Sequence, residues 1–373
     1  MGALYIGLMS GTSLDGVDGA LVDLEPRGAD LITVLAHAHR PFPRVLADEL
    51  LALNAVTSNE LHRAALAANA LVVLYAQIVD ALLANAGVPR GQVRAIGAHG
   101  QTVRHRPGEF DGVGYTVQLN NPALLAERCG IDVVADFRSR DVAAGGQGAP
   151  LVPAFHRAIF GRAGGALAVL NLGGIANLTL LAADGTTLGF DCGPANALMD
   201  HWCQQHTGQA YDANGAWAAS GTVIEALLAA LLREPYFSRA IPKSTGRDLF
   251  HADWLAAHLR THPGPCRAQD VQATLAELTV RTVADALLHH APASTGLLVC
   301  GGGALNGHLM ARLAAVLPAV HVQASDALGL PAQQVEACAF AWLARACVER
   351  RPGNLASVTG AAGPRVLGAI YPA

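Results

Sequence analysis

The sequence has few charged and few aromatic side chains, 14% and 5% of its 373 residues, and a formal net charge of only −4. It contains no run of Lys and Arg residues, which excludes the basic surface typical of nucleic-acid-binding proteins. Its seven cysteines are scattered and include no C-x-x-C pair, which argues for a reducing compartment and against a zinc site. An anionic ligand must therefore be bound locally, by a loop.

Long uninterrupted apolar runs are also missing, although 52% of the residues are hydrophobic. The best candidate, Ala64 to Ala86, is interrupted by Asn69, Gln77, Asp80 and Asn85, and predicts a buried amphipathic helix rather than a membrane span. The N-terminus lacks a basic segment followed by a continuous apolar one, so no secretory signal is expected. We therefore expect a cytoplasmic protein that binds neither nucleic acid nor a membrane.

The chain does contain glycine-bounded turns between apolar runs. The run Ala3 to Met9 leads into Ser10-Gly11-Thr12-Ser13-Leu14-Asp15-Gly16, and a second run extends from Val17 to Leu24. The glycines allow close backbone approach and positive φ, hydroxyl and N–H groups suit an anion, and the Asp15 carboxylate suits a cation beside it. An ordinary polar β-hairpin turn accounts for these residues equally well.

The same arrangement of strand, glycine turn and strand recurs roughly 160 residues later, which indicates an internal duplication at domain scale. There Ala166 to Leu172 leads into Gly173-Gly174, and Ile175 to Leu181 returns. The glycine-rich stretch Ala143 to Pro150 lies between the two copies. We expect an α/β protein with domains at 1–145 and 146–373, with the option that the last helix or tail packs back on the first domain.

Polar residues follow two short apolar runs of the first domain. Gln101 comes shortly after the run Val93 to Ala98, and Asp136 and Arg138 follow Asp132 to Ala135. Open α/β sheets bind ligands at the carboxyl ends of their strands. Gln101 is a candidate sugar-binding amide, whereas a lone His99 in this position is more often structural than catalytic.

In the second domain, Asp191 is expected between the end of a strand and a helix that begins at Pro194. A general base and a helix N-cap explain this position equally well. The triple glycine at 301–303 follows a strand at 296–300, matches neither G-x-G-x-x-G nor the P-loop, and suits a flat base or ribose lying against backbone. Glu336 is a lone carboxylate among apolar residues of a helix at 332–350, so it is either functional or paired.

Five motifs together give the chain a family resemblance over nearly its whole length. They are Ser10-Gly11-Thr12-Ser13-Leu14-Asp15-Gly16, Gly148-Ala149-Pro150-Leu151-Val152-Pro153, Asn171-Leu172-Gly173-Gly174-Ile175-Ala176-Asn177, Asp191-Cys192-Gly193-Pro194-Ala195-Asn196 and Lys243-Ser244-Thr245-Gly246-Arg247. The sequence resembles the anhydro-N-acetylmuramic acid kinases, which belong to the sugar kinase, Hsp70 and actin superfamily. The resemblance implies two ribonuclease-H-like domains around a central cleft, and a homodimer.

The resemblance also implies the reaction and its cofactors, ATP and Mg²⁺. Water opens the 1,6-anhydro bridge of anhydro-N-acetylmuramic acid and O6 receives the γ-phosphoryl group, which gives N-acetylmuramic acid 6-phosphate for peptidoglycan recycling. Asp191 is the expected base, and Glu336 is expected to orient the sugar or Asp191. Attack by water opposite the bridging oxygen predicts inversion at C1.

Further roles follow from the positions of residues in the motifs. The residues expected to bind the nucleotide are Gly11, Thr12, Ser13, Leu14, Asp15, Gly16, Val17, Asp18, Asn171, Gly173, Gly174, Gly301, Gly302, Gly303 and Asn306. Those expected to bind the sugar are Ser10, Asp15, Gln101, Asp136 and Arg138. Asp15 is also expected to reach the metal through water, and Arg138 to pair with the lactyl carboxylate.

Two residues depart from the family pattern: Ala195 replaces a usual glycine and Cys192 a common threonine. Both changes are small, and Ala195 is tolerated if its φ is negative. One alternative function is that of another carbohydrate or carboxylate kinase of the same superfamily. A second is an ATP-driven binding protein of the Hsp70 or actin type, which requires an added module or an assembly surface that the sequence does not reveal.

Overall fold

The computed structural model describes residues 3–11, 13–25, 32–161, 165–246 and 249–373, and it divides the chain into two compact units. Unit 1 comprises Met1–Ile159 together with Gln334–Ala373, and unit 2 comprises Phe160–Gln333. The division therefore falls after Ile159 rather than after residue 145. The C-terminal segment Gln334–Ala373 belongs to unit 1.

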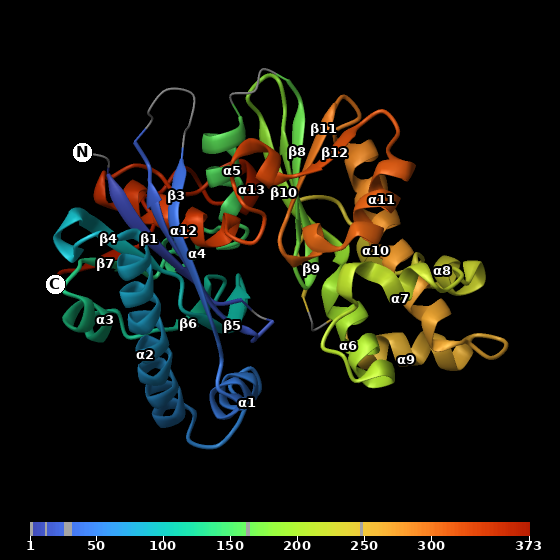
Figure 1. Ribbon diagram of the computed structural model, residues 1–373, viewed down its shortest axis with the longest axis horizontal. Coiled ribbons are helices and arrows are strands. Elements are labelled where there is room, and N and C mark those ends of the chain that lie inside the picture. Colours follow the sequence, from blue (N-terminus) through green and yellow to red (C-terminus); the bar gives the residue numbers. More distant parts are fainter. Residues whose placement is uncertain (1–2, 12, 26–31, 162–164, 247–248) are drawn as a thin grey trace. The chain divides into compact units, whose positions relative to one another are not determined.

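Unit 1 is built on a six-stranded sheet with the order β13-β7-β4-β1-β2-β3 (Figure 1). Its strands are β1 (Leu4–Met9), β2 (Gly16–Asp23), β3 (Thr33–Pro41), β4 (Val93–Ala98), β7 (Val133–Ala135) and β13 (Ala369–Tyr371). Strands β1, β2 and β3 form an antiparallel meander, β4 is parallel to β1, and β7 is parallel to β4. This is the ribonuclease-H-like strand order that the resemblance implies. A separate hairpin joins β5 (Gln101–Pro107) to β6 (Gly114–Leu119).

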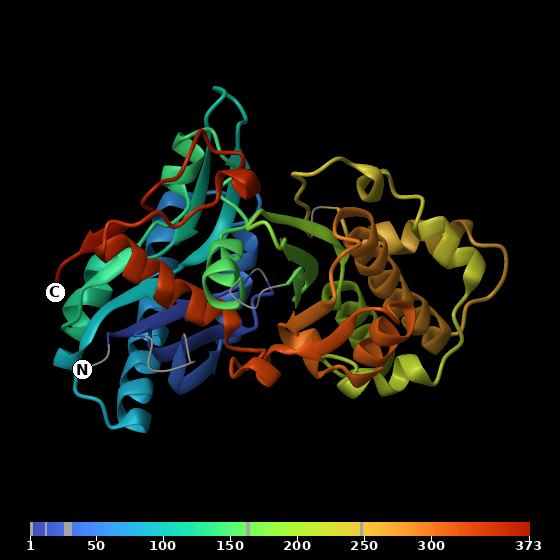
Figure 2. The same ribbon diagram turned by 90° about the horizontal axis from the view of Figure 1, so that it is seen from above.

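Two long helices cover opposite faces of this sheet. The helices of unit 1 are α1 (Arg44–Ala52), α2 (Glu60–Ala86), α3 (Pro122–Cys129), α4 (Ser139–Ala143), α5 (Val152–Phe160, which reaches the first residue of unit 2), α12 (Val335–Val348) and α13 (Ala356–Thr359), with a 3₁₀ turn at Arg90–Gln92. A Cβ on Gly19 would meet Ile78 of α2, whereas one on Gly7 would meet the backbone of α12. Gly7 pairs with Ala20, the neighbour of Gly19, so the alternation of strand residues places α2 and α12 on different faces. Both views show α12, in red, beside the blue strand β1 (Figures 1 and 2).

Helix α2 is the one helix among the described residues that is long and apolar enough to cross a membrane. Half of its most apolar window is buried inside the protein. Leu71, Val72, Tyr75 and Ile78 are fully buried and belong to the core of unit 1. The amphipathic core helix expected from the sequence is thus present.

Unit 2 repeats the strand order of unit 1 in a five-stranded sheet, β10-β9-β8-β11-β12. The strands are β8 (Leu167–Leu172), β9 (Ile175–Leu181), β10 (Thr187–Pro194), β11 (Gly296–Cys300) and β12 (His321–Ala324). Strands β8, β9 and β10 form an antiparallel meander, and β11 lies parallel between β8 and β12. The duplication inferred from the glycine turns is therefore a duplication of topology, and both units are ribonuclease-H-like.

The helices of unit 2 pack around α10, which lies in the core. They are α6 (Asn196–Thr207), α7 (Ala216–Ala219), α8 (Glu225–Leu231), α9 (Ala252–Thr261), α10 (Ala268–His290) and α11 (Gly307–Val316), with 3₁₀ turns at Ala213–Gly215, Pro235–Ser238, Gly302–Leu305 and Ser325–Leu328. Val271, Leu275, Leu278 and Val283 of α10 are buried in the main apolar cluster of this unit. The glycine turn at 173–174 follows β8 and the triple glycine follows β11, so this sheet and α10 position both loops.

Candidate active site

Three loops of unit 1 meet at the carboxyl ends of its parallel strands. The loop after β1 contacts the loop after β4, because the amide of Gln101 donates from Nε2 to the carbonyl of Gly11 at 3.0 Å. The loop after β4 contacts the segment after β7, because Arg138 donates to the ring of His99. The residues predicted from three separate parts of the sequence thus lie at one edge of one sheet, as expected for open α/β sheets.

A closed ring of hydrogen bonds fixes the first two loops. Ser10 is 1% exposed, and its hydroxyl donates to the carbonyl of Gly100 at 3.1 Å. Gly100 N–H donates to the Tyr75 hydroxyl at 3.0 Å, which leaves the Tyr75 hydroxyl to donate to Ser10 Oγ at 3.2 Å. The Ser10 hydroxyl is therefore engaged in hydrogen bonds within the protein. Tyr75 of α2 supports both loops, and the apolar sequence around it gave no sign of this role.

The first glycine turn differs in detail from the expectation. Leu14, not a glycine, has positive φ, at +60°. Gly16 is required for space instead, because a Cβ there would meet the backbone of Arg40 on the neighbouring strand β3. Ser13 donates to the exposed carboxylate of Asp15 at 2.7 Å. Thr12 lies outside the described residues.

The two predicted nucleotide residues that follow this turn belong to strand β2. Val17 is fully buried in the core of unit 1, so its side chain is not available to a ligand. Asp18 Oδ1 lies 3.2 Å from His37 Nε2 and 3.1 Å from His39 Nδ1, both on β3. The carboxylate of Asp18 is thus engaged by two imidazoles of the adjacent strand.

Gln101 and Asn120 carry buried amide oxygens that have no donor among the described residues. The whole side chain of Gln101 is buried, and its Oε1 has no such partner. Asn120, just after β6, has an unpartnered Oδ1 and only one long contact, from Nδ2 to the carbonyl of Ala98 at 3.5 Å. A Cβ on Gly100 would lie 3.2 Å from Asn120 Cβ, so both amides flank the same loop. Asn120 was not predicted from the sequence, because it directly precedes Asn121, the N-cap of α3. An Asn in this position is easily attributed to the helix cap.

The segment after β7 holds the two remaining sugar candidates of unit 1. Asp136 is exposed, has φ of +57°, and accepts from Ser139 N–H at the start of α4. Arg138 donates from Nε and Nη2 to His99 Nε2, at 3.2 and 2.9 Å, and from Nη1 to the carbonyl of Gly148 at 2.8 Å. Burial lowers the pKa of Arg138 to about 10, while Glu336 and Asp141 act in the opposite direction. The guanidinium therefore keeps its charge at neutral pH.

Glu336 lies in the first turn of α12, which places its carboxylate near the same edge. Burial raises its pKa; the charge of Arg138 opposes this rise, and Asp18 and Asp15 add to it. Glu336 is half-buried and is electrostatically coupled to the residues predicted around it. The three charged groups that act on its pKa thus belong to unit 1.

In unit 2 the glycine turn is fixed by the start of helix α6. Ala195 and Ala197 donate their N–H groups to the carbonyl of Gly174, and Asn196 N–H donates to that of Gly173. Within the part of the chain that the structure describes, the N–H groups of Gly173 and Gly174 have no acceptor. The turn therefore presents donors while its carbonyl groups are occupied, which suits an anion. Ala195 has φ of −129°, so the negative φ that its tolerance requires is present.

The triple glycine after β11 packs against the end of β8. Cβ atoms on Gly301 or Gly303 would meet Leu172, and one on Gly301 would also meet the buried amide of Asn171. A Cβ on Gly302 would have only the amide nitrogen of Asn196 nearby, at 3.8 Å, so Gly302 is the least crowded of the three glycines. The packing against β8 is therefore a reason for glycine at two of the three positions, and the predicted contact of this turn with the nucleotide stays a prediction.

Asn306, the last of the nucleotide candidates, is the N-cap of helix α11. Its Oδ1 accepts from Leu309 N–H at 3.1 Å, as expected of a capping residue. The capping bond uses the side-chain oxygen, so Asn306 positions the helix that follows the triple glycine.

Asp191 is not a helix cap. Strand β10 continues to Pro194 and helix α6 begins at Asn196, so the expected helix start at Pro194 was wrong. Asp191 lies inside β10 beside an irregularity in its pairing with β9, and its Oδ2 accepts from Thr245 N–H at 2.9 Å. Burial raises the pKa of Asp191 to about 7, although the bond from Thr245 lowers it. A carboxyl group with this pKa is half ionised at neutral pH, which suits a general base.

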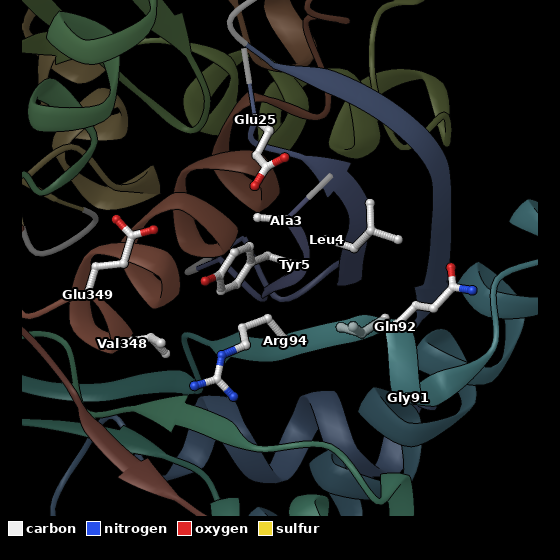
Figure 3. Close-up of a pocket in the computed structure, with 10 residues that line it drawn as sticks. Ala3, Leu4, Tyr5, Glu25, Gly91, Gln92, Arg94, Val348 and Glu349 are labelled. Carbon is white, nitrogen blue, oxygen red and sulfur yellow. The ribbon is translucent and has the colours of Figure 1, made fainter. Parts of the chain in front are cut away.

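A surface hollow of about 560 Å³ lies elsewhere in unit 1, at the opposite ends of β1 and β4 (Figure 3). Tyr5, Glu25, Arg94 and Glu349 are among the residues that line it. None of the predicted site residues lines it. Because ligands bind at the carboxyl ends of strands in such sheets, this hollow is not the expected active site.

Comparison with known proteins identifies the family. The sequence profile of the anhydro-N-acetylmuramic acid kinase family matches residues 3–373. A protein of Variovorax paradoxus (strain S110) described as anhydro-N-acetylmuramic acid kinase is 64% identical over 378 residues, covering 100% of both chains. The chain belongs to the anhydro-N-acetylmuramic acid kinase family. It is thus a phosphotransferase that acts on an alcohol group.

Other similar proteins include a second curated relative with the same description and a solved structure of a sugar kinase. An anhydro-N-acetylmuramic acid kinase of Cupriavidus pinatubonensis is 60% identical over 373 residues, covering 100% of this chain and 99% of its own. Among solved structures, a ROK family glucokinase from Streptomyces griseus in complex with glucose and AMPPNP is 15% identical, with a TM-score of 0.43. It covers 92% of this chain, and 99% of the glucokinase chain is matched.

Proposed function

We propose that this chain converts 1,6-anhydro-N-acetylmuramic acid, water and ATP into N-acetylmuramic acid 6-phosphate and ADP, in the recycling of peptidoglycan. The observation that carries this proposal is the full-length similarity, at 64% identity, to a kinase described by that substrate. The chemistry of the individual residues supports it, beginning with Asp191.

Asp191 is the proposed general base for opening the anhydro bridge. Its carboxylate takes one proton from water, the water oxygen bonds to C1, and the bond from C1 to O6 breaks. O6 then bonds to the γ-phosphorus of ATP as the bond to the β-phosphate oxygen breaks and ADP leaves. The phosphoryl group traps O6, so no separate acid has to protonate it. A carboxylate with a pKa of about 7 is a stronger base than an ordinary Asp and is still ionised in half of the molecules at neutral pH.

The nucleotide phosphates are proposed to bind the two glycine turns, one in each unit. The unoccupied N–H groups of Gly173 and Gly174 support this role in unit 2. In unit 1 the carbonyl of Gly11 is bound by Gln101 and by Leu14 N–H, which holds the turn in one conformation. Phosphoryl transfer requires mainly positioning and charge neutralisation, and such preformed loops supply the first.

Mg²⁺ is proposed to accompany ATP. Among the described residues no group of three or more His, Cys, Asp or Glu side chains is arranged to hold a metal ion. Mg²⁺ in kinases commonly uses one or two carboxylates together with substrate phosphates and water, so the single exposed carboxylate of Asp15 fits this requirement. The metal, when bound, neutralises phosphate charge.

The sugar is proposed to bind residues at the strand ends of unit 1. Arg138 has N–H groups left for the lactyl carboxylate, and Gln101 has a buried oxygen that suits a sugar hydroxyl or the acetamido N–H. Asp136 is exposed beside them. The unpartnered oxygen of Asn120 adds an acceptor of the same kind.

Mass spectrometry of the product formed in ¹⁸O-water tests this function. We expect one ¹⁸O atom, located at C1, in a product that also carries one phosphoryl group. A phosphorylated product that keeps the anhydro bridge contains no ¹⁸O and would contradict the coupled reaction. The Asp191→Asn variant, which keeps the shape of the side chain, is the control for the role of the base.

We propose further that the protein acts in the cytoplasm as a homodimer, without a nucleic-acid or membrane partner. All seven cysteines are free thiols, which accords with a reducing compartment. Light scattering of the purified protein tests the dimer, and fractionation of cells tests the compartment.

A further inference from the structure

We propose that His99 is a positioning residue that orients Arg138 toward the carboxylate of the sugar without neutralising its charge. This inference rests on the proposed function, in which Arg138 binds the lactyl carboxylate. It gives a role to a histidine that the sequence alone marked as structural.

The hydrogen bonds of His99 determine its tautomer. Arg138 has only donors, so His99 Nε2, which lies 3.2 Å from Arg138 Nε and 2.9 Å from Nη2, must accept. The ring proton is therefore on Nδ1, which lies 3.3 Å from the carbonyl of Ser10 and donates to it. His99 thus connects the loop after β1 to the guanidinium after β7 through one rigid ring.

The ring itself is held firmly and stays neutral. His99 is 4% exposed, and its ring centroid lies 4.6 Å from that of Phe340 on α12. Burial and the adjacent Arg138 lower the pKa of His99 to about 3. Protonation therefore does not disturb the acceptor at any pH at which the enzyme is expected to work.

Counting the donors of Arg138 shows what remains for a ligand. A guanidinium has five N–H groups. Those on Nε and on one side of Nη2 are directed at His99, and one on Nη1 is donated to the carbonyl of Gly148. One N–H is left on each terminal nitrogen, so the guanidinium keeps two donors for the oxygens of a carboxylate.

The two acceptors that hold Arg138 share one property, which is that both are uncharged. A carboxylate in the place of His99 would fix the guanidinium equally well but would compete with an anionic ligand for its charge. An imidazole and a carbonyl group fix the geometry without adding a negative charge to those of Glu336 and Asp141, which already act on Arg138. Gly148 is itself fixed, because its N–H donates to the buried carboxylate of Asp141 at 2.8 Å.

The test compares two sugars, anhydro-N-acetylmuramic acid and 1,6-anhydro-N-acetylglucosamine, which has the same bridge but no lactyl carboxylate. The measured quantity is the ratio of their kcat/KM values, or of their dissociation constants by calorimetry where the second sugar is turned over too slowly. General loosening of the protein changes both values together, whereas loss of carboxylate recognition changes their ratio.

Two variants of His99 form a matched pair. His99→Asn keeps a donor near the Ser10 carbonyl but is too short to accept from Arg138, and it should lower the ratio by about 10- to 100-fold. His99→Gln reaches the position of Nε2 with an amide oxygen, and it should keep the ratio within about threefold of the wild-type value. His99→Phe, which keeps the ring beside Phe340, should behave like His99→Asn. The melting temperature of each variant shows whether it folds, and the Asn and Gln pair suffices where the Phe variant does not.

Arg138→Ala separates the two possible failures. It should lower the ratio at least as much as His99→Asn, and the double variant should fall no further, because the two residues act as a unit. If Arg138→Ala leaves the ratio unchanged, the proposed role of Arg138 is wrong and the inference falls with it. If Arg138→Ala lowers the ratio but His99→Asn does not, only the role of His99 is overturned.

Discussion

Gly7 of β1 and Gly97 of β4 are paired side by side, and the backbone of helix α12 lies directly over both. A Cβ on Gly7 would meet the carbonyl of Ala337, and one on Gly97 would meet that of Phe340. This glycine pair lets α12 approach the sheet at the distance of backbone contact. It thereby fixes the first turn of α12, and Glu336 with it, at the edge where the candidate site lies.

Alanine at Gly7 should therefore destabilise the protein by about 1–3 kcal/mol, because the backbone of α12 cannot yield as a side chain can. Urea unfolding measures the change. Gly91→Ala is the control, since a Cβ there has no atom within 4 Å and should leave stability nearly unchanged. Equal stability of the two variants would contradict the close approach of α12.

The pH dependence of kcat/KM should report the ionisation of Asp191. Because burial raises its pKa to about 7, the base is protonated and inactive at lower pH, and activity should rise with pH and level off above about pH 8. A carboxylate with an ordinary pKa would give a flat profile between about pH 5 and 8. Asp191→Asn should lose about 10²–10⁴-fold in turnover while it still binds sugar and ATP, which calorimetry checks. A flat profile, or near-normal turnover of this variant, would remove Asp191 from the role of base.

The same raised pKa has a consequence for stability. Between its ordinary value of 3.8 and about 7, Asp191 is protonated in the folded state and ionised in the unfolded state. Unfolding therefore releases a proton, and the stability that this group contributes, full below pH 3.8, is lost as pH rises to about 7. Asp191→Asn has no such ionisation, so its stability relative to the wild type should increase between pH 5 and pH 8. Denaturant unfolding of both proteins at the two pH values measures this, and a constant difference would contradict the raised pKa.

Much of this arrangement was predictable from the sequence because it depends on local patterns. The two glycine turns follow alternating apolar runs, and both were found where expected, as were the long helices α2 and α10 and the strand β11. Their repeated order indicated the duplication that the two sheets display. Such features need only the spacing of apolar residues and glycines.

The remainder depends on contacts between distant residues, which no local pattern encodes. From the sequence, Asp191 could equally be a helix cap or a base because Pro194 resembles a helix start, but pairing with β9 extends the strand through Pro194. The need for glycine at positions 7 and 97 could not be predicted, because helix α12, which packs on both, lies more than two hundred residues away in the sequence. Tyr75 was not among the predicted residues, because the hydrogen bonds of its hydroxyl to Ser10 and Gly100 join distant parts of the sequence.

Asp141 should be essential to the stability of the segment that carries Gly148. Its buried carboxylate accepts from Asn354 Nδ2 at 2.6 Å, from the Thr359 hydroxyl at 2.8 Å and from Gly148 N–H at 2.8 Å. Asp141→Asn keeps the volume but replaces one acceptor with donors that face other donors, so it should cost about 1–3 kcal/mol, measured by urea unfolding. Asp111→Asn is the control, because that carboxylate accepts from two N–H groups in an exposed turn. Similar losses in both variants would show that burial of Asp141 is not what makes it important.

The configuration of the first product formed should reveal the direction of water attack. If Asp191 activates a water that reaches C1 opposite the bridging oxygen, the configuration at C1 inverts and the α anomer forms first. The anhydro bridge occupies one face of the ring, so only the other face is open to the nucleophile. Rapid proton NMR of the anomeric signal, recorded before the anomers equilibrate, should therefore show α product converting slowly to the mixture. Initial β product would require attack from the bridged side, or a covalent intermediate, and would exclude Asp191 as a base acting on water in a single displacement.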